Sequence, residues 1–222
     1  MILRLATFVV ACAALCGETW AQQPSPAGPT PDDVDLVTSR VYVFVGKKGL
    51  GHDHAVIGML RAGHVQLDAA EQAGQLVFDM GSFRADTADA RKVLGLPGET
   101  DAKTQQQVND NMLGPDVLDV ARHPTATLTI RSALRSQRPA PGPLPLYELS
   151  GTFTLHGVAR PVVVFAEVET VGGIVRLKGS FPIKQTDFGM KPYAKFGGVV
   201  GVADELKIYG DIRLVAAQGP AR

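Results

Sequence analysis

The chain has 222 residues, and its 22 Lys and Arg balance 22 Asp and Glu, so the formal net charge is zero. A neutral chain lacks the excess positive charge that displaces counterions from phosphates, and we expect no nucleic-acid partner. Hydrophobic residues make up 45% of the sequence, which is too many for a disordered chain and enough for a core. The length is compatible with one all-β domain.

The first 21 residues have the pattern of a secretory signal peptide. Arg4 gives a positive start, residues 5–16 form an apolar run, and the small residues Thr19 and Ala21 favour cleavage after position 21. A helix needs about 20 apolar residues to span a bilayer, so this run predicts no stable membrane insertion. We therefore expect a periplasmic or secreted protein.

Both cysteines of the chain, Cys12 and Cys16, lie within the predicted signal peptide. Lipidation is the alternative to cleavage after Ala21, because residues 9–12 loosely fit a lipidation box. A mature chain that begins at Gln22 contains no cysteine, which excludes disulfides, thiolate nucleophiles and cysteine-bound metals.

Most of the remaining chain has the alternation of apolar and polar residues that is typical of β-strands. Residues 22–34 contain four prolines and are predicted to be a flexible leader, and residues 218–222 form a short tail. We assign residues 35–217 to one barrel domain. Its eight predicted strands lie at residues 35–46, 53–68, 75–84, 125–133, 147–156, 161–170, 174–184 and 204–216.

The segment between the third and fourth predicted strands lacks this alternation and is expected to hold two short helices. Asp86 and Thr87 are candidate caps for the first helix, which is predicted to end at Leu94. We interpret Asp86 as such a cap in preference to an acid catalyst. The second helix is predicted at residues 104–113.

The predicted fold class is all-β, an eight-stranded antiparallel barrel with a short helical insertion. Short connections between successive strands favour antiparallel neighbours, and closure into a barrel removes both exposed sheet edges. A barrel of eight strands is just wide enough for side chains or one slender ligand. Sequence alternation is equally compatible with a filled interior and with an apolar cavity.

The turn at residues 51–54 carries the most specific candidate site. His52 and His54 are two positions apart, so in an extended segment both imidazoles lie on one face. We interpret them as contacts for the polar head group of a ligand, or as residues that shape the turn. A zinc- or copper-dependent function is the alternative, although we assign no metal or other cofactor. His64 and His156 occupy polar positions of their strands and are expected to face solvent.

The sequence contains none of the GxSxG, HExxH, GxxxxGKS or GxGxxG motifs. Aromatic residues on or beside the predicted strands pack in the core by default. The walls of an apolar ligand tunnel are the functional alternative, because each buried CH₂ group contributes about 0.8 kcal/mol. The candidate wall residues are Phe44, Phe78, Phe153, Leu155, Phe165, Phe181 and Phe188.

The sequence resembles the YceI-like family of secreted, lipocalin-like proteins that bind polyisoprenoid lipids. The resemblance covers nearly all of the predicted mature chain and rests on fragments in a shared order. The most specific fragment is LSGTFTLHGV at residues 149–158. The others include SRVYVF at 39–44, GHVQLD at 63–68, SFRADT at 82–87, HPTATL at 123–128, TDFG at 186–189 and VADELKI at 202–208.

The resemblance implies a lipocalin-like barrel with a long interior pocket for an isoprenoid lipid, such as a quinone or polyprenyl carrier. It implies binding and not catalysis, so no catalytic residue is carried over. Two departures bear on the ligand: Val117 stands where the family often has Phe, and residues 96–107 are an extra segment. A secreted stress or adhesion module with a filled barrel is a further alternative, and a homodimer is one expectation for the oligomeric state.

Overall fold

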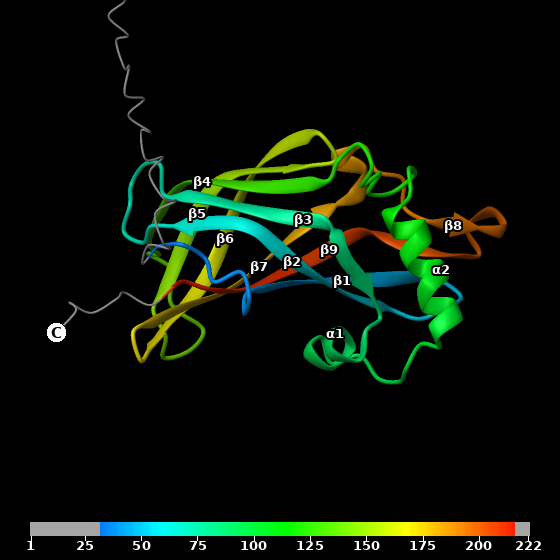
Figure 1. The fold of residues 1–222 in the computed structure, drawn as a ribbon, viewed down its shortest axis with the longest axis horizontal. Helices are drawn as coiled ribbons and strands as arrows, with labels where there is room; N and C mark the ends of the chain where they lie inside the picture. Colours follow the sequence, from blue (N-terminus) through cyan, green and yellow to red (C-terminus); the bar gives the residue numbers. More distant parts are fainter. Residues whose placement is uncertain (1–31, 216–222) are drawn as a thin grey trace, which may run out of the picture.

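An eight-stranded antiparallel barrel dominates residues 32–215, the part of the chain that the computed structural model describes (Figure 1). The predicted signal peptide, both cysteines and the predicted tail lie outside the described residues. The barrel strands are β1 (Arg40–Gly49), β2 (His54–Val65), β3 (Gly74–Ala85), β4 (Thr125–Arg135), β5 (Leu146–Leu155), β6 (Val158–Val171), β7 (Ile174–Lys184) and β9 (Val200–Arg213).

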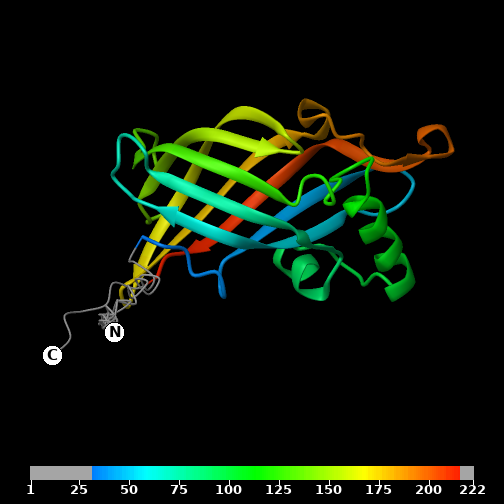
Figure 2. The same cartoon turned by 45° about the horizontal axis from the view of Figure 1, so that its top comes forward.

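The last barrel strand closes the sheet. Each strand from β1 to β6 pairs with the next one, and β9 pairs with both β7 and β1, always antiparallel. Ile208 of β9 lies opposite Phe181 on one side and Val43 on the other. Figure 2 shows the tilted strands wrapping around a common interior. The fold class predicted from sequence alternation is therefore confirmed.

Alternation along the strands places one set of side chains in the barrel interior, as β4 illustrates. Ala126, Leu128 and Ile130 are buried, whereas Thr129 and Arg131 between and beyond them are exposed. Burying a side chain of the size of Leu contributes about 1.5–3 kcal/mol, so the inward set supplies most of the driving force for closure. The inward-facing residues, which occupy every second position of the strands, thus form a single core that runs along the barrel.

A cluster of four phenylalanines forms part of this core. The ring of Phe153 on β5 makes edge-to-face contacts with Phe78, Phe181 and Phe188, at centroid distances of 6.2, 5.5 and 5.7 Å. This geometry sets the positive edge of one ring against the negative face of the next. All four side chains are buried. Phe153 therefore links β3, β7 and the short helix η1 (Gln185–Phe188) across the interior.

Two helices, α1 (Ala88–Val93) and α2 (Ala102–Leu113), lie outside the barrel wall (Figure 2). Thr87 caps α1, because its Oγ1 accepts a hydrogen bond from the Ala90 N–H at 3.2 Å. Asp101 caps α2 through the N–H groups of its second and third residues, so this helix begins two residues before its predicted start. Neither helix is long and apolar enough to cross a membrane, nor is any other helix among residues 32–215.

The ends of the barrel differ from the sequence prediction in three places. Val34, assigned above to the leader, is 5% exposed and pairs with Leu214, so the folded part begins earlier than expected. The first strand starts at Arg40, five residues later than predicted, because the Asp35 carboxylate accepts hydrogen bonds from the N–H groups of Val37 and Thr38 and forms a turn. The short elements β8 (Ala194–Lys195) and η2 (Phe196–Gly198) were not predicted.

Candidate functional site

An apolar cavity of about 160 Å³ lies inside the barrel. Protein interiors are close-packed and rarely contain voids larger than a water molecule, so this space is not a packing defect of ordinary size. The inward residues of the barrel strands supply most of its wall, among them Val43, Phe78, Ala126, Phe153 and Leu155. The polar members of the wall are few, namely His54, Asn111, Gln185 and Tyr193.

Helix α2 covers part of this cavity and is fixed to the end of β3 by two side chains. The Ala85 N–H donates to Oδ1 of Asn109 at 2.7 Å, and Nε2 of Gln105 donates to the Ala85 carbonyl at 3.0 Å. These bonds satisfy the last backbone groups of the strand and hold the helix in register. Val108 and Met112 of α2 then face the cavity. The helical insertion is therefore part of the cavity wall.

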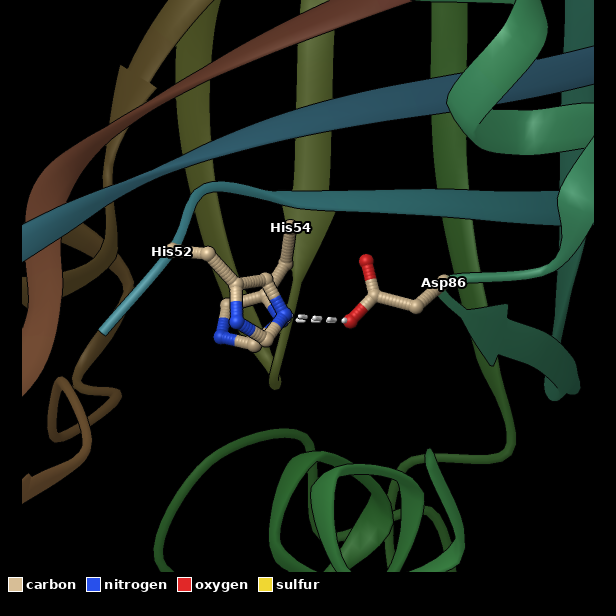
Figure 3. Close-up of side chains that lie close together, drawn as sticks. All are labelled: His52, His54 and Asp86. Atoms are coloured by element: carbon tan, nitrogen blue, oxygen red, sulfur yellow. Dashed lines mark hydrogen bonds and ion pairs between the residues drawn. The ribbon is translucent and has the colours of Figure 1, made fainter. Parts of the chain in front are cut away.

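The carboxylate of Asp86 organises the polar side of the site (Figure 3). Its side chain is fully buried, and Oδ2 lies 2.7 Å from Nδ1 of His54 and 3.3 Å from Nε2 of His52. A carboxylate only accepts hydrogen bonds, so the two histidine nitrogens that face it carry hydrogen. The other oxygen, Oδ1, accepts from Nη1 of Arg91 at 2.9 Å and from the Ala55 N–H at 3.1 Å.

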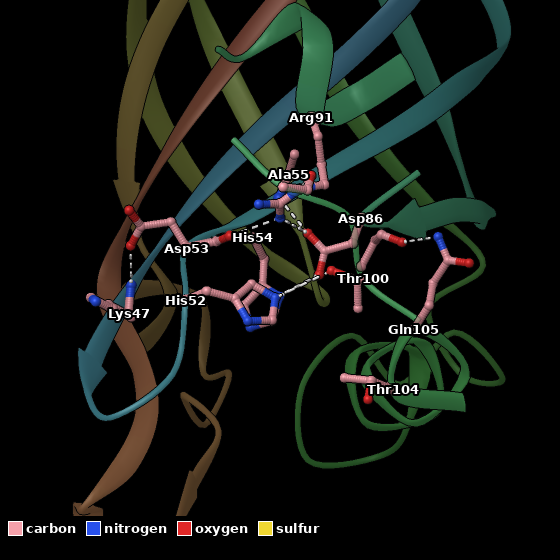
Figure 4. Close-up of polar contacts among 12 residues, drawn as sticks. Lys47, His52, Asp53, His54, Ala55, Asp86, Arg91, Thr100, Thr104 and Gln105 are labelled. Carbon is pink, nitrogen blue, oxygen red and sulfur yellow. Dashed lines mark hydrogen bonds and ion pairs between the residues drawn. The ribbon is translucent and has the colours of Figure 1, made fainter. Parts of the chain in front are cut away.

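Arg91 reaches Asp86 from α1 and is itself buried (Figure 4). Its guanidinium also donates to the backbone carbonyls of Asp53, Pro97 and Gly98. A buried guanidinium with all of these partners holds both the turn before β2 and the loop after α1 in place. The network therefore joins the turn before β2 to α1 and to the loop that follows α1.

The pKa of the Asp86 carboxyl lies well below its ordinary value of 3.8. Burial alone raises this pKa, but the hydrogen bonds from His54, from the Ala55 backbone and from Arg91 outweigh burial because they favour the charged form. Asp86 is therefore ionised in the folded protein. The prediction that Asp86 caps α1 is wrong, since its carboxylate is occupied by this network and Thr87 supplies the cap.

His52 and His54 form one cluster, as the two-residue spacing predicted. Their ring centroids are 4.6 Å apart, but only His54 lines the cavity, while the His52 side chain is 44% exposed. With Nδ1 committed to Asp86, a neutral His54 keeps Nε2 as a hydrogen-bond acceptor at the cavity wall. The two rings and Asp86 are close enough to surround an ion, yet the 2.7 Å contact is a direct hydrogen bond.

Five of the seven predicted wall residues lie in the barrel interior. Phe78, Phe153 and Leu155 line the cavity. Phe181 and Phe188 are buried against Phe153 and do not line it.

The interior placement predicted for Phe44 and Phe165 is wrong. Phe44 follows the buried Val43 on β1 and is only partly buried, so the strand period turns its side chain to the outer face. Phe165 stands between two buried neighbours on β6 and also faces outward, where the Arg138 guanidinium lies 4.2 Å from its ring centroid. Both strands are apolar on both faces, so the sequence did not show which of their residues face the interior.

Several residues of the site were not predicted from the sequence. Arg91 and Asn109 sit on short helices whose docking to the barrel no periodicity reveals. Gln185 and Tyr193 lie in the segment between β7 and β9, outside the predicted strands. One feature of the sequence could have indicated the role of Arg91: it follows Asp86 by five residues and carries the opposite charge. Val117, where the sequence departs from the family it resembles, lies in the cavity wall.

A closed eight-stranded antiparallel barrel with an apolar cavity and few polar wall groups defines a lipocalin-like fold. Residues 33–214 match the YceI-like domain family, and the chain belongs to this family. No curated protein sequence matches the chain.

Two solved structures share this fold. The crystal structure of BcnA from Burkholderia cenocepacia is 23% identical and has a TM-score of 0.55, and the match covers 82% of this chain and 100% of that one. A polyisoprenoid binding domain from Saccharophagus degradans, implicated in plant cell wall breakdown, is 16% identical with a TM-score of 0.57. That match covers 83% of this chain and 97% of the other.

Proposed function

We propose that the protein binds an isoprenoid lipid of the quinone or polyprenyl type, with the hydrocarbon tail in the barrel cavity. The observation that carries this proposal is the cavity itself, whose wall is apolar apart from four residues. Membership of the YceI-like family supports the proposal, as does the fold shared with a polyisoprenoid binding domain. The protein acts as a carrier or sequestering protein and not as an enzyme.

The affinity of such a site comes from the hydrocarbon tail. Each CH₂ group moved from water into an apolar wall contributes about 0.8 kcal/mol, so affinity rises with the length of tail that is buried and requires no charged contact. Phe78, Phe153 and Leu155 supply part of this wall. An uncharged cavity of this kind selects for length and shape of a hydrocarbon, which suits an isoprenoid chain.

The polar residues of the wall recognise the head group in this proposal. His54 offers Nε2 as an acceptor, because Asp86 already occupies Nδ1. Tyr193 and Asn111 add groups that both donate and accept hydrogen bonds. A quinone carbonyl or a terminal hydroxyl is matched by this uncharged set. His52 contacts the outer part of a head group, since it is exposed beside His54.

The protein works outside the inner membrane in this proposal. Residues 1–21 serve as the signal peptide. The intact mass of the exported protein is expected to equal that of a chain that begins at Gln22. Cell fractionation followed by intact-mass measurement tests this expectation. A lipid-modified mass, or a full-length cytoplasmic product, contradicts it.

Lipid mass spectrometry of the protein extracted under native conditions from membrane-rich cells tests the ligand. We expect an isoprenoid lipid to co-purify in a fixed ratio to the protein. Repeated recovery of protein without lipid contradicts the proposal. A straight-chain fatty acid in place of an isoprenoid keeps the carrier function and overturns the ligand class.

Ala126→Leu is expected to reduce lipid binding about 50-fold. Ala126 is 2% exposed and lines the cavity, and three added carbon atoms displace about three ligand CH₂ groups at about 0.8 kcal/mol each. Titration with a short-chain ubiquinone measures the change. Ala62→Leu is the matched control, because Ala62 is exposed on β2 and its enlargement leaves the cavity unchanged.

The same pair of variants separates an open barrel from a filled one. In an open cavity the Ala126→Leu protein keeps its thermal stability, because the new side chain enters existing space. In a filled interior the substitution overpacks the core and costs about 1–3 kcal/mol. Lost stability with unchanged ubiquinone binding contradicts the position proposed for the lipid tail.

A further inference from the structure

A second cluster of histidine and carboxylate side chains lies apart from the cavity wall. Asp119, His123 and His156 each bring one ligand atom to within 4.8 Å of the others. Asp119 and His123 belong to the turn that leads from α2 into β4, and His156 belongs to the turn between β5 and β6. The two imidazole rings have centroids 4.5 Å apart. None of the three residues lines the cavity.

His156 presents an unpartnered nitrogen in this cluster. Its Nδ1 donates a hydrogen bond to the Phe188 carbonyl at 3.2 Å, and a carbonyl only accepts, so Nε2 carries the lone pair of the neutral ring. Nε2 is buried and has no hydrogen-bond partner among the described residues. A buried polar atom without a partner is unfavourable, and coordination of a cation by this lone pair would remove the penalty. The prediction that His156 faces solvent is wrong for this atom.

The arrangement of His156 is that of a metal-ligating histidine. Such histidines donate the hydrogen of one ring nitrogen to a carbonyl or carboxylate, which fixes the tautomer and turns the other nitrogen to the metal. The backbone of His156 is left-handed, with φ of 51°, as is that of Asp119, with φ of 43°. Two non-glycine residues in this region at one site indicate that the surroundings enforce the positions of both side chains.

Backbone bonds and packing hold the other two residues beside His156. The N–H of His123 donates to the Asp119 carbonyl at 2.8 Å, which tightens the turn that carries both side chains. The His123 ring packs on Gly157, where a Cβ atom would lie 3.0 Å from Cε1 of the ring. Nε of Arg122 donates to Oδ2 of Asp119 at 2.6 Å and orients the carboxylate, whose side chain is 9% exposed.

We propose that Asp119, His123 and His156 bind one divalent transition-metal ion, with zinc as the best match. Two imidazoles and one carboxylate form a donor set that zinc accepts in tetrahedral geometry with a fourth position open to water. Ligand atoms at about 2.0–2.1 Å from such an ion lie about 3.3 Å apart, so side-chain shifts of about 1 Å close the cluster. The ion ties the α2–β4 turn to the β5–β6 turn.

Zinc titration of the tag-free, chelator-treated protein tests the proposal, with isothermal calorimetry as the readout. We expect one ion per chain, and a higher melting temperature when zinc is present. His156→Asn and Asp119→Asn each alter a direct ligand and are expected to weaken binding by at least the roughly 10–100-fold that loss of an outer-shell partner costs, and to abolish the thermal shift. Asparagine is chosen because it tolerates the left-handed backbone at both positions. Cobalt in place of zinc reports tetrahedral coordination by its visible absorption.

Two control variants decide which histidines are responsible. His64→Asn removes a partly exposed histidine far from the cluster, and the double variant His52→Asn/His54→Asn alters the cluster around Asp86. Both are expected to keep the wild-type zinc affinity. The proposal is overturned if the wild type binds no zinc at micromolar concentration, or if binding survives both Asp119→Asn and His156→Asn. Loss of binding in the double variant alone moves the site to His52 and His54, and also overturns it.

Discussion

Asp86→Ala is expected to destabilise the folded protein by about 3–5 kcal/mol. The substitution leaves the buried guanidinium of Arg91 without its counter-ion, and an unpaired buried charge carries a cost of this size. It also removes the acceptor for the Ala55 N–H and for Nδ1 of His54. Urea unfolding followed by circular dichroism measures the loss.

Two further variants isolate the charge from the other effects of this substitution. Asp86→Asn keeps an oxygen acceptor and tolerates the left-handed backbone at this position, where φ is 54°, so it is expected to lose less stability than Asp86→Ala. Asp89→Ala removes an exposed carboxylate three residues further on and is expected to change stability by about 0.5 kcal/mol. A loss below about 1 kcal/mol for Asp86→Ala contradicts the assigned role.

The Asp86 network also predicts how stability depends on pH. The folded protein holds the pKa of Asp86 below its ordinary value of 3.8, so the unfolded chain takes up a proton more readily. The contribution of Asp86 is complete above about pH 5 and declines as the pH falls below 4 toward the folded pKa. Urea unfolding between pH 3 and pH 6, at about unit steps, is expected to show a shallower decline for Asp86→Asn than for the wild type. Parallel curves for the two proteins contradict this prediction.

Phe153→Ala is expected to cost about 3–5 kcal/mol, the range for truncating a buried phenylalanine. The ring is 4% exposed and makes edge-to-face contacts with Phe78, Phe181 and Phe188, so its removal leaves three aromatic faces or edges without a partner. Because Phe153 also lines the cavity, the variant enlarges the space available to a ligand. Thermal and urea unfolding measure the stability loss.

Phe165→Ala is the matched control for this prediction. Phe165 lies on the same barrel but faces outward beneath Arg138, and the same truncation there is expected to cost about 1 kcal/mol. The contrast between the two variants measures what interior packing adds to a phenylalanine on this barrel. Equal losses in the two variants argue against the Phe153 cluster as the centre of the core.

Many strands of this protein were predictable because a strand with one buried and one exposed face alternates apolar and polar residues. The alternation in β4, β5 and β9 specifies both the strand and its buried face. Where a strand is apolar on both faces, the alternation disappears and the buried face is not visible in the sequence. Residues 41–45 offer an apolar side chain at every position, so the sequence alone did not distinguish the inward Val43 from the outward Phe44.

In the polar sites, the pairs of residues that are close in sequence were predictable, and the partners that the fold brings together were not. The spacing of His52 and His54 is local and correctly indicated a shared cluster, whereas Asp86 meets them across 32 and 34 residues. Local rules assigned Asp86 to a helix cap, because they contain no information on tertiary partners. The same limit applies to His123 and His156, which the sequence shows only as isolated histidines and the fold brings together.

The pairing of β1 with β9 has a consequence for biogenesis. The first and last barrel strands form a seam across about 150 residues of chain or more, so the seam closes only after nearly the whole polypeptide is synthesised. Contacts between such distant segments form slowly, since the intervening chain must first be ordered. A nascent chain that lacks its final strand therefore stays open. The barrel of this protein is therefore completed last along its β1–β9 seam.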